Sequence, residues 1–315
     1  MYFSVAGIEV QPWIPPLTAF CVSFFTSMGG VSGAFLLLPF QMNILGYVNP
    51  SVSATNHVFN ITAIPAGVYR YIREGRMVWP LTWVVIIGTL PGVFIGSLLR
   101  VLYLPDPRNF KFFVGLVLLY IGGRMILDLL KKPAPGQDKK SAEKRFQEMV
   151  KAWRRRAEST GEKLPAVRVT RFSTTRIAYE FYGEAFEIST PGILSLSLVV
   201  GVIGGTYGIG GGAIIAPFFV SVFGLPVYTV AGAALMGTCV TSLAGVTFFQ
   251  VIAPWFPNQS VAPDWILGLL FGLGGMAGMY LGARCQKFVP ARYIKWMLGA
   301  VIFWMALKYV IGFFL

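Results

Sequence analysis

The sequence predicts an all-α, polytopic membrane protein. Hydrophobic residues make up 55% of the chain and charged residues 12%, which is about half the charged share usual in soluble domains. Apolar segments of about 20 residues, the length needed to cross a bilayer, recur along the chain. The 36 glycines and 20 prolines favour helices that pack closely or break around a buried site.

Eight apolar segments can be placed on the sequence, four on each side of one polar stretch at residues 131–190. The first and fifth are too long and too glycine-rich for one plain helix, because each glycine weakens a helix by about 1 kcal/mol relative to alanine. Each of these two is therefore expected to be broken into two half-helices. The expected segments are residues 17–45, 50–72, 79–103, 110–130, 191–223, 228–254, 263–286 and 293–313.

The polar stretch at residues 131–190 carries fourteen basic and eight acidic residues. Residues 141–158 can form an amphipathic helix, and alternating apolar residues beyond Pro165 predict a small β-hairpin, which makes the insert α+β. Its charge is typical of a cytoplasmic loop that sets the orientation of the protein. A regulatory or partner-binding domain, or one that contacts anionic lipid, is the other interpretation. The alternating residues are Val167, Val169, Tyr179, Phe181, Phe186 and Ile188.

The two halves of the chain resemble each other. One constant shift, the 178 positions that separate Gly33 from Gly211, also brings Pro39 onto Pro217. The sequence therefore predicts a duplication, with a first transmembrane repeat at 1–130, a cytoplasmic insert at 131–190 and a second repeat at 191–315. Other pairs under this shift are Phe40 with Phe218, Gly46 with Gly224, Val52 with Val230, Gly67 with Gly245, and Val68 with Val246.

Basic residues favour repeats of opposite orientation. If all eight segments crossed the bilayer, seven basic residues in loops would lie outside, against the positive-inside rule. If the first and fifth segments are re-entrant, the repeats are inverted and only Arg100, Arg108 and Lys111 are misplaced. We therefore expect inverted repeats, a pattern that places a transport site between them near the midplane of the bilayer.

The glycine-rich breaks are the first candidate for a binding site. Where half-helices meet, free N–H groups and the positive end of the helix dipole can hold an anion without a basic side chain. The segment that follows each break adds polar residues at matched positions, since Asn60 falls on Thr238. The candidate substrate-binding residues are Ser27, Gly29, Gly30, Ser32, Gly33, Asn56, Asn60, Thr206, Gly208, Gly210, Gly211, Gly212, Thr238 and Ser242.

Structural interpretations compete at several of these positions. Any single polar residue inside a membrane is more often a bridge between helices than a ligand-binding group. Two GxxxG pairs, Gly92 with Gly96 and Gly278 with Gly282, are expected to serve close helix packing. His57, the single histidine, is weighed as a proton relay, but the structural role is favoured because Leu235 stands at its matched position.

Other classes of function have little support. No clustered His, Asp or Glu residues and no cysteine with a partner base stand out, so an enzyme is not expected. The three cysteines show no metal-ligand spacing, and Gly208, Gly210 and Gly211 match a dinucleotide fingerprint only loosely. The sequence therefore predicts no cofactor, no metal and no nucleic-acid partner.

Two motifs resemble the TauE/SafE family, also called the sulfite exporter or 4-toluene sulfonate uptake permease family. They are Ser27-Met-Gly-Gly-Val-Ser-Gly33 followed by Pro39, and the run from Gly204 to Gly212 followed by Pro217 and Gly237-Thr238. The resemblance implies export of a sulfur-containing anion, such as sulfite, thiosulfate or an organosulfonate, through the plasma membrane of a bacterium or archaeon. It also implies that the two glycine-rich turns, with Thr238, form the central site.

The sequence leaves several alternatives open. An anion channel and an uptake permease for another small organic acid are alternatives within transport. A membrane-anchored receptor that acts through residues 131–190 is an alternative of another class. The expected partners are a small anionic substrate and the lipid bilayer, and a homo-oligomer or a cytoplasmic partner of the insert would be compatible with the sequence.

Overall fold

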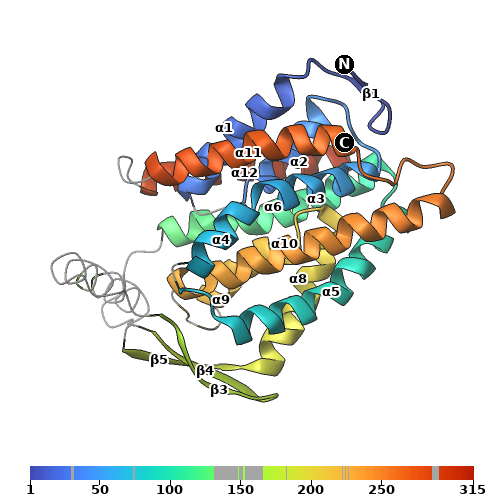
Figure 1. Ribbon diagram of the computed structural model, residues 1–315. Helices are drawn as coiled ribbons and strands as arrows, with labels where there is room; N and C mark the ends of the chain where they lie inside the picture. The colour runs from blue at the N-terminus through green and yellow to red at the C-terminus, as the bar shows by residue number, and fades with distance from the viewer. Residues whose placement is uncertain are drawn as a thin grey trace.

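The structure is a computed structural model that describes residues 1–29, 32–73, 75–130, 148, 152, 166–181, 183–221, 223, 225, 227–285 and 291–315. Most of it is a bundle of helices (Figure 1). A short β-hairpin precedes the first helix, with strands β1 (Tyr2–Phe3) and β2 (Ile8–Glu9). The helices before the insert are α1 (Ile14–Gly29), α2 (Ala34–Asn43), α3 (Ser51–Ala63), α4 (Pro65–Arg73), α5 (Trp79–Leu102) and α6 (Pro107–Leu130).

A three-stranded sheet leads into the second set of helices. Its strands are β3 (Arg168–Phe172), β4 (Arg176–Phe181) and β5 (Glu184–Ser189). The helices that follow are α8 (Thr190–Tyr207), α9 (Gly211–Ser221), α10 (Val227–Ile252), the 3-10 turn η1 (Ala253–Trp255), α11 (Trp265–Cys285) and α12 (Ala291–Phe314).

Within the described residues, six helices are long and apolar enough to cross a membrane: α5, α6, α8, α10, α11 and α12. The chain is therefore a multi-pass membrane protein. The two glycine-rich segments are each two helices, α1 with α2 and α8 with α9, as expected. The segment expected at 50–72 is also divided, because α3 ends before Pro65, which has no N–H to continue the ladder of hydrogen bonds.

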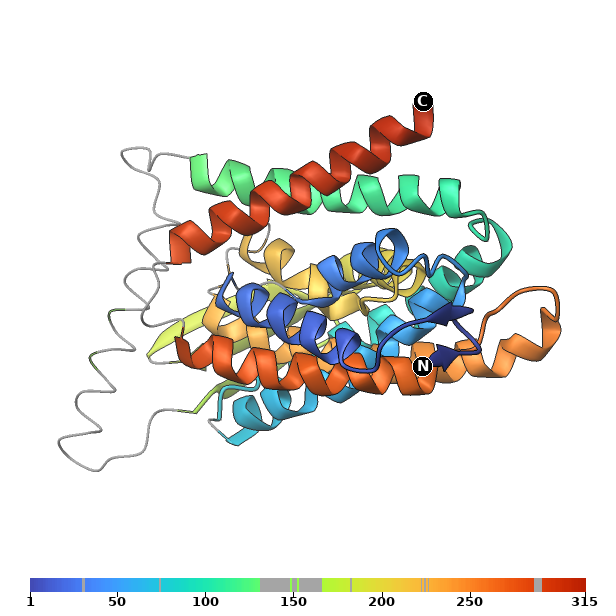
Figure 2. The same cartoon turned by 90° about the horizontal axis from the view of Figure 1, so that it is seen from above.

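The bundle has two distinct ends (Figure 2). At the insert end, Val167 N donates to Gly75 O at 3.0 Å and so joins the insert to the turn between α4 and α5. At the opposite end, which we call the terminal end, lie both chain termini. There, Ser260 Oγ donates to Val5 O at 2.6 Å and holds the N-terminal hairpin against the loop before α11.

The sheet in the insert is antiparallel, in the order β3-β4-β5. Along β4, Ile177, Tyr179 and Phe181 are buried in alternation with more exposed residues. The Tyr179 hydroxyl donates to Thr229 Oγ1 at 3.0 Å near the start of α10, and burial raises the pKa of this phenol above its usual value. The sequence predicted a hairpin here, and the structure adds a third strand. The helix expected at 141–158 lies outside the described residues.

Two pairs of parallel helices have glycines at their contacts. In α5, a side chain at Gly92 or Gly96 would collide with the carbonyl oxygens of Leu198 and Val202 in α8. In α11, a side chain at Gly278 or Gly282 would collide in the same way with backbone oxygens of α1. These four glycines therefore serve close packing, which confirms the interpretation of the two GxxxG pairs.

Each pair of half-helices returns to the end from which it starts. Gly192, near the start of α8, lies against the ring of Phe223, just beyond the end of α9 at the insert end. The pair α1 and α2 starts from the terminal end, and α2 ends there at Asn43, which donates to the Tyr309 hydroxyl at 2.7 Å. The breaks between half-helices therefore lie inside the bundle.

Candidate functional site

The break between α8 and α9 is a tight turn that requires glycine at two positions. Gly208 and Gly210 have φ values of 86° and 72°, a left-handed conformation that other residues rarely adopt. A Cβ atom at Gly210 would lie 2.8 Å from Ser242 Oγ and 2.9 Å from Thr238 Cγ2. The turn therefore reverses the chain and brings the backbone directly onto the middle of α10.

Helix α9 begins at this turn, against α10. The Gly211 N–H donates to Thr241 Oγ1 at 3.3 Å. A Cβ at Gly212 would collide with Ala234 O, and it would lie 2.6 Å from Thr238 Oγ1. The positive end of the α9 dipole thus lies among the hydroxyl groups of α10.

Helix α3 contributes the polar side chains on the other side of the break. Asn60 Nδ2 donates to Ser242 Oγ at 3.2 Å, and His57 Nδ1 lies 3.2 Å from the same oxygen. Ser53 Oγ donates to Thr206 O at 3.0 Å, at the end of α8. Asn60 and Ser242, from the two halves of the chain, therefore meet in one hydrogen-bonded cluster.

Two amide oxygens in this cluster have no partner. Asn56 and Asn60 are fully buried, and within the described residues neither Asn56 Oδ1 nor Asn60 Oδ1 accepts a hydrogen bond. The Asn56 amide nitrogen donates to Ala34 O at 3.4 Å, at the start of α2. A buried polar atom without a partner is costly, so these two oxygens are candidates for contact with a ligand.

The break between α1 and α2 is in contact with the break between α8 and α9. The Tyr207 hydroxyl, at the end of α8, donates to Phe35 O in the first turn of α2 at 2.9 Å. At the same break, a Cβ at Gly33 would lie 2.8 Å from Ser23 Oγ. Both breaks therefore belong to one central region, bounded by α3 and α10.

Other residues expected from the sequence form side-chain hydrogen bonds with partners other than Asn60 and Ser242. Ser27 Oγ donates to Phe24 O at 3.1 Å and lies against Gly282 of α11. The Thr206 hydroxyl donates to Gly96 O at 3.0 Å, in the contact between α8 and α5. Ser32 Oγ accepts from Ala34 N at 3.3 Å. Gly29 is the last residue of α1, and Gly30 lies outside the described residues.

The list of candidate residues left out three polar residues of this region, Ser53, Thr241 and Tyr207, although Thr241 and Tyr207 stand beside candidates in the sequence. Ser53 could have been found, because it lies three and seven residues before Asn56 and Asn60, on the same helical face. Thr241 gives a weaker signal, since it precedes Ser242 in a helix rich in small residues. Tyr207 flanks the glycine run in the sequence, but the sequence gives no signal that its hydroxyl donates to Phe35 O.

The chemical groups of the cluster are those of hydrogen bonding. In the described part of the chain, no group of three His, Cys, Asp or Glu side chains is placed so that it could hold a metal ion. The cluster consists of amides, hydroxyls, one imidazole and backbone groups, which suit hydrogen bonding to a small polar ligand.

Comparisons with known proteins identify similar membrane transporters. The family model described as "Sulfite exporter TauE/SafE" matches residues 16–309. A relative in Bacillus subtilis, "Probable membrane transporter protein YdhB", is 24% identical over 123 residues, which cover 39% of this chain and 47% of the relative. The match thus spans about half the length of that relative. No solved structure matches the chain.

Proposed function

Because the chain belongs to the TauE/SafE sulfite exporter family, whose members are membrane transporters and not enzymes, we propose that it exports a small sulfur-containing anion from the cytoplasm. Sulfite, thiosulfate and organosulfonates are the proposed substrates. The similar Bacillus subtilis protein, named a probable membrane transporter, supports transport in general. The substrate and the direction of transport are our proposal.

The observation that carries this proposal is the buried polar cluster at the breaks. Asn56 Oδ1 and Asn60 Oδ1 have no partner among the described residues, although both side chains are fully buried. Inside a membrane, irregular backbone and unpaired polar atoms are tolerated only where they line a cavity or meet a ligand. A substrate that passes through this region would contact both the irregular backbone of the breaks and the unpaired amide groups.

An anion can be held here without a basic side chain. Helices α2 and α9 begin at the two breaks, so the positive ends of their dipoles are available at this depth. Ser242 and Thr241 add hydroxyl groups, and the Asn60 amide can supply donors if it turns away from Ser242. The proposed site consists of Gly33, Asn56, Asn60, Gly208, Gly210, Gly211, Gly212, Thr238, Thr241 and Ser242.

We also propose that residues 1–130 and 191–315 are inverted repeats. The packing supports this, because α1 lies along α11 just as its counterpart α8 lies along α5, and α3 meets α11 as α10 meets α5. Counterparts also run in opposite directions: α5 leaves the insert end and α11 approaches it (Figure 2). A site between two such repeats can open to either side of the membrane in turn.

The distribution of charge supports a cytoplasmic insert end. The part of the insert that the structure describes next to the bundle carries Arg168, Arg171 and Arg176, and the end of α4 and the turn after it carry Arg73 and Arg76 at the same end. In the sequence, the whole insert at 131–190 has fourteen basic residues. Under a potential that is negative inside, an anion that leaves the cell gains about 2.3 kcal/mol per charge per 100 mV. Export therefore requires no coupling ion.

The test is flux in proteoliposomes that hold a set membrane potential. Radiolabelled sulfite, thiosulfate and a larger sulfonate are loaded, and their efflux is compared with that from liposomes without protein. We expect saturable efflux that follows the potential. Flux that does not saturate would replace the transporter with a channel, and no flux from folded protein would favour the receptor that acts through the insert.

A further inference from the structure

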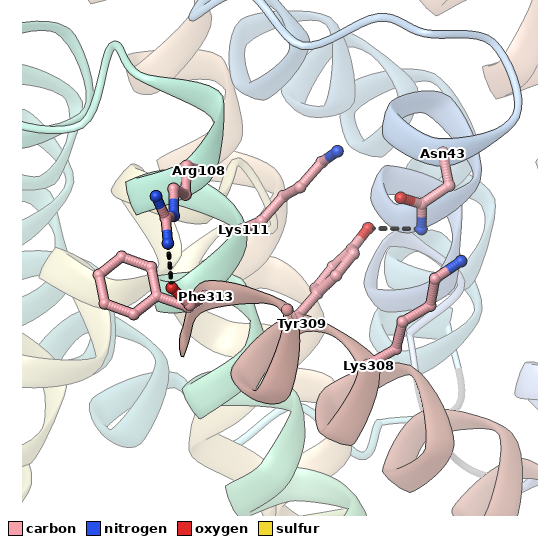
Figure 3. Close-up of a pocket in the computed structure, with 7 residues that line it drawn as sticks. Asn43, Arg108, Lys111, Lys308, Tyr309 and Phe313 are labelled. Carbon is pink, nitrogen blue, oxygen red and sulfur yellow. Dashed lines mark hydrogen bonds between the residues drawn. The ribbon is translucent and has the colours of Figure 1, made fainter. Parts of the chain in front are cut away.

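A basic cavity lies at the terminal end, apart from the proposed transport site. It has a volume of about 200 Å³, which is room for one small anionic group. Three helices form it (Figure 3). Its lining includes Arg108 and Lys111 of α6, Lys308, Tyr309 and Phe313 of α12, and Asn43 of α2.

The three cations of this cavity have no anionic partner in the part of the chain that the structure describes. Within the described residues, no carboxylate lies within 4 Å of Arg108, Lys111 or Lys308. The nearby Asp106 instead accepts from the backbone N–H groups of Arg108, at 2.6 Å, and Asn109, at 3.3 Å. Like charges that share one cavity repel each other, and a bound anion would remove this repulsion.

Tyr309 and Arg108 both have hydrogen-bond donors that remain available in the cavity. Asn43 Nδ2 donates to the Tyr309 hydroxyl oxygen at 2.7 Å, so the Tyr309 proton remains available to a ligand. Arg108 Nη2 donates to Phe313 O at 2.5 Å, which fixes the guanidinium and leaves its other N–H groups for an anion. In Figure 3, Lys111 and Lys308 extend on either side of Tyr309.

The two long helices that form the cavity have much of their surface on the outside of the protein. Helices α6 and α12 are the least buried of the six candidate spans, since only 28% of the apolar stretch of each is buried inside the protein. Aromatic rings gather at the same end: those of Phe112 and Phe313 stack with centroids 4.3 Å apart, and Phe314 lies against both. Aromatic and basic residues at helix ends are typical of the headgroup region.

We propose that this cavity binds the phosphate of an anionic membrane lipid, whose acyl chains lie along α6 and α12. The three cations and the Tyr309 hydroxyl match the charge and the acceptor oxygens of a phosphodiester. The dipole of α6, which begins at Pro107, adds positive potential at the same place. The site would join α2, α6 and α12 at one surface of the membrane.

The test measures lipid retention by native mass spectrometry of purified protein in detergent. Phosphatidylglycerol is compared with zwitterionic phosphatidylcholine, for the natural chain and for a triple variant, Arg108→Gln with Lys111→Gln and Lys308→Gln. We expect the apparent Kd for phosphatidylglycerol to rise about a hundredfold in the variant, and that for phosphatidylcholine to stay unchanged.

A matched control removes the same number of charges elsewhere. Arg73, Arg168 and Arg171 are exposed and belong to the insert end, so their replacement by Gln should leave retention at the cavity unchanged. A single variant, Lys111→Gln, tests the site if the triple variant is unstable, and it should weaken phosphatidylglycerol binding about fivefold. If the natural chain and both cavity variants retained phosphatidylglycerol equally, the proposal would be overturned.

A soluble anion is the alternative occupant. Sodium sulfate at increasing concentration, added without lipid, should raise the melting temperature of the natural chain by no more than that of the triple variant. A selective rise in the natural chain, with no preference for phosphatidylglycerol, would replace the lipid by a free anion. Neither result depends on which substrate the protein transports.

Discussion

The Tyr207 hydroxyl donates a hydrogen bond to Phe35 O at 2.9 Å and so replaces a bond that α2 cannot make. In an α-helix, this carbonyl would accept from the N–H four residues later, but that residue is Pro39, which has none. The Phe35 and Tyr207 rings also meet edge to face, with centroids 6.2 Å apart. A residue of one half of the chain thus completes the backbone bonding of the other.

Tyr207→Phe should lower the stability of the protein, because it leaves Phe35 O without this donor in an apolar interior. We expect a loss of about 1 to 2 kcal/mol. Thermal unfolding in detergent measures it, with Tyr103→Phe as the control, since Tyr103 is 72% exposed. Equal melting temperatures for the two variants would show that the bond is unimportant for stability.

Gly210→Ala should reduce anion flux by about tenfold or more, because it strains a backbone with φ of 72° and places a methyl group 2.8 Å from Ser242 Oγ. Efflux from proteoliposomes measures the effect, and gel filtration checks that the variant is folded. Gly123→Ala is the matched control, since nothing lies within 4 Å of a Cβ at that position. If both variants transport at the natural rate, the turn has no part in transport.

Asn60→Asp should abolish anion flux, because a carboxylate at the centre of the proposed site repels the substrate. At a separation of about 4 Å and an effective dielectric constant of 20, this repulsion costs about 4 kcal/mol. Efflux is measured beside that of Asn60→Ser, which keeps a neutral polar group and should retain part of the flux.

Asn258→Asp adds the same charge in an exposed loop and should have no effect on flux. Anion flux that survives Asn60→Asp, in protein with a normal melting temperature, would contradict the proposed site.

Gly92→Ala and Gly278→Ala should destabilise the protein to a similar extent. At each position the added methyl group collides with a backbone oxygen, Leu198 O for Gly92 and Phe20 O for Gly278. We expect a loss of about 1 to 3 kcal/mol for each variant, typical of overpacking. Melting temperatures measured beside Gly123→Ala test this, and strongly unequal losses would count against equivalent roles in two repeats.

The sequence was sufficient to predict most of the helical elements, because a bilayer allows few backbone conformations for a long apolar segment. Long apolar runs must become helices, and the glycine clusters at 29–33 and 208–212 mark where the first and fifth runs divide. The break before Pro65 was missed, although proline gives a clear local signal. Apolar residues on both sides of Pro65 made the segment look continuous.

The candidate site was harder to predict, because it depends on how each helix is rotated. Helix α1 is mostly apolar and has no charged residue, so the sequence could not show that Ser27 lies against Gly282. Asn60 was selected because the repeat matches it to Thr238, and Ser242 because it lies one turn after Thr238. The structure places Asn60 Nδ2 3.2 Å from Ser242 Oγ. The basic cavity gave no local signal, since Arg108 and Lys308 meet only through the pairing of α6 with α12.

The glycine contacts determine which parts of the protein can move together. Helix α8 is in backbone contact with α5, and α1 with α11, so no side chains separate the helices of either pair. A helix packed in this way cannot slide without its neighbour, because carbonyl groups of one helix fit against glycines of the other. Any rearrangement that opens the centre would therefore move α8 with α5, or α1 with α11, and each such moving unit contains one helix from either side of the insert.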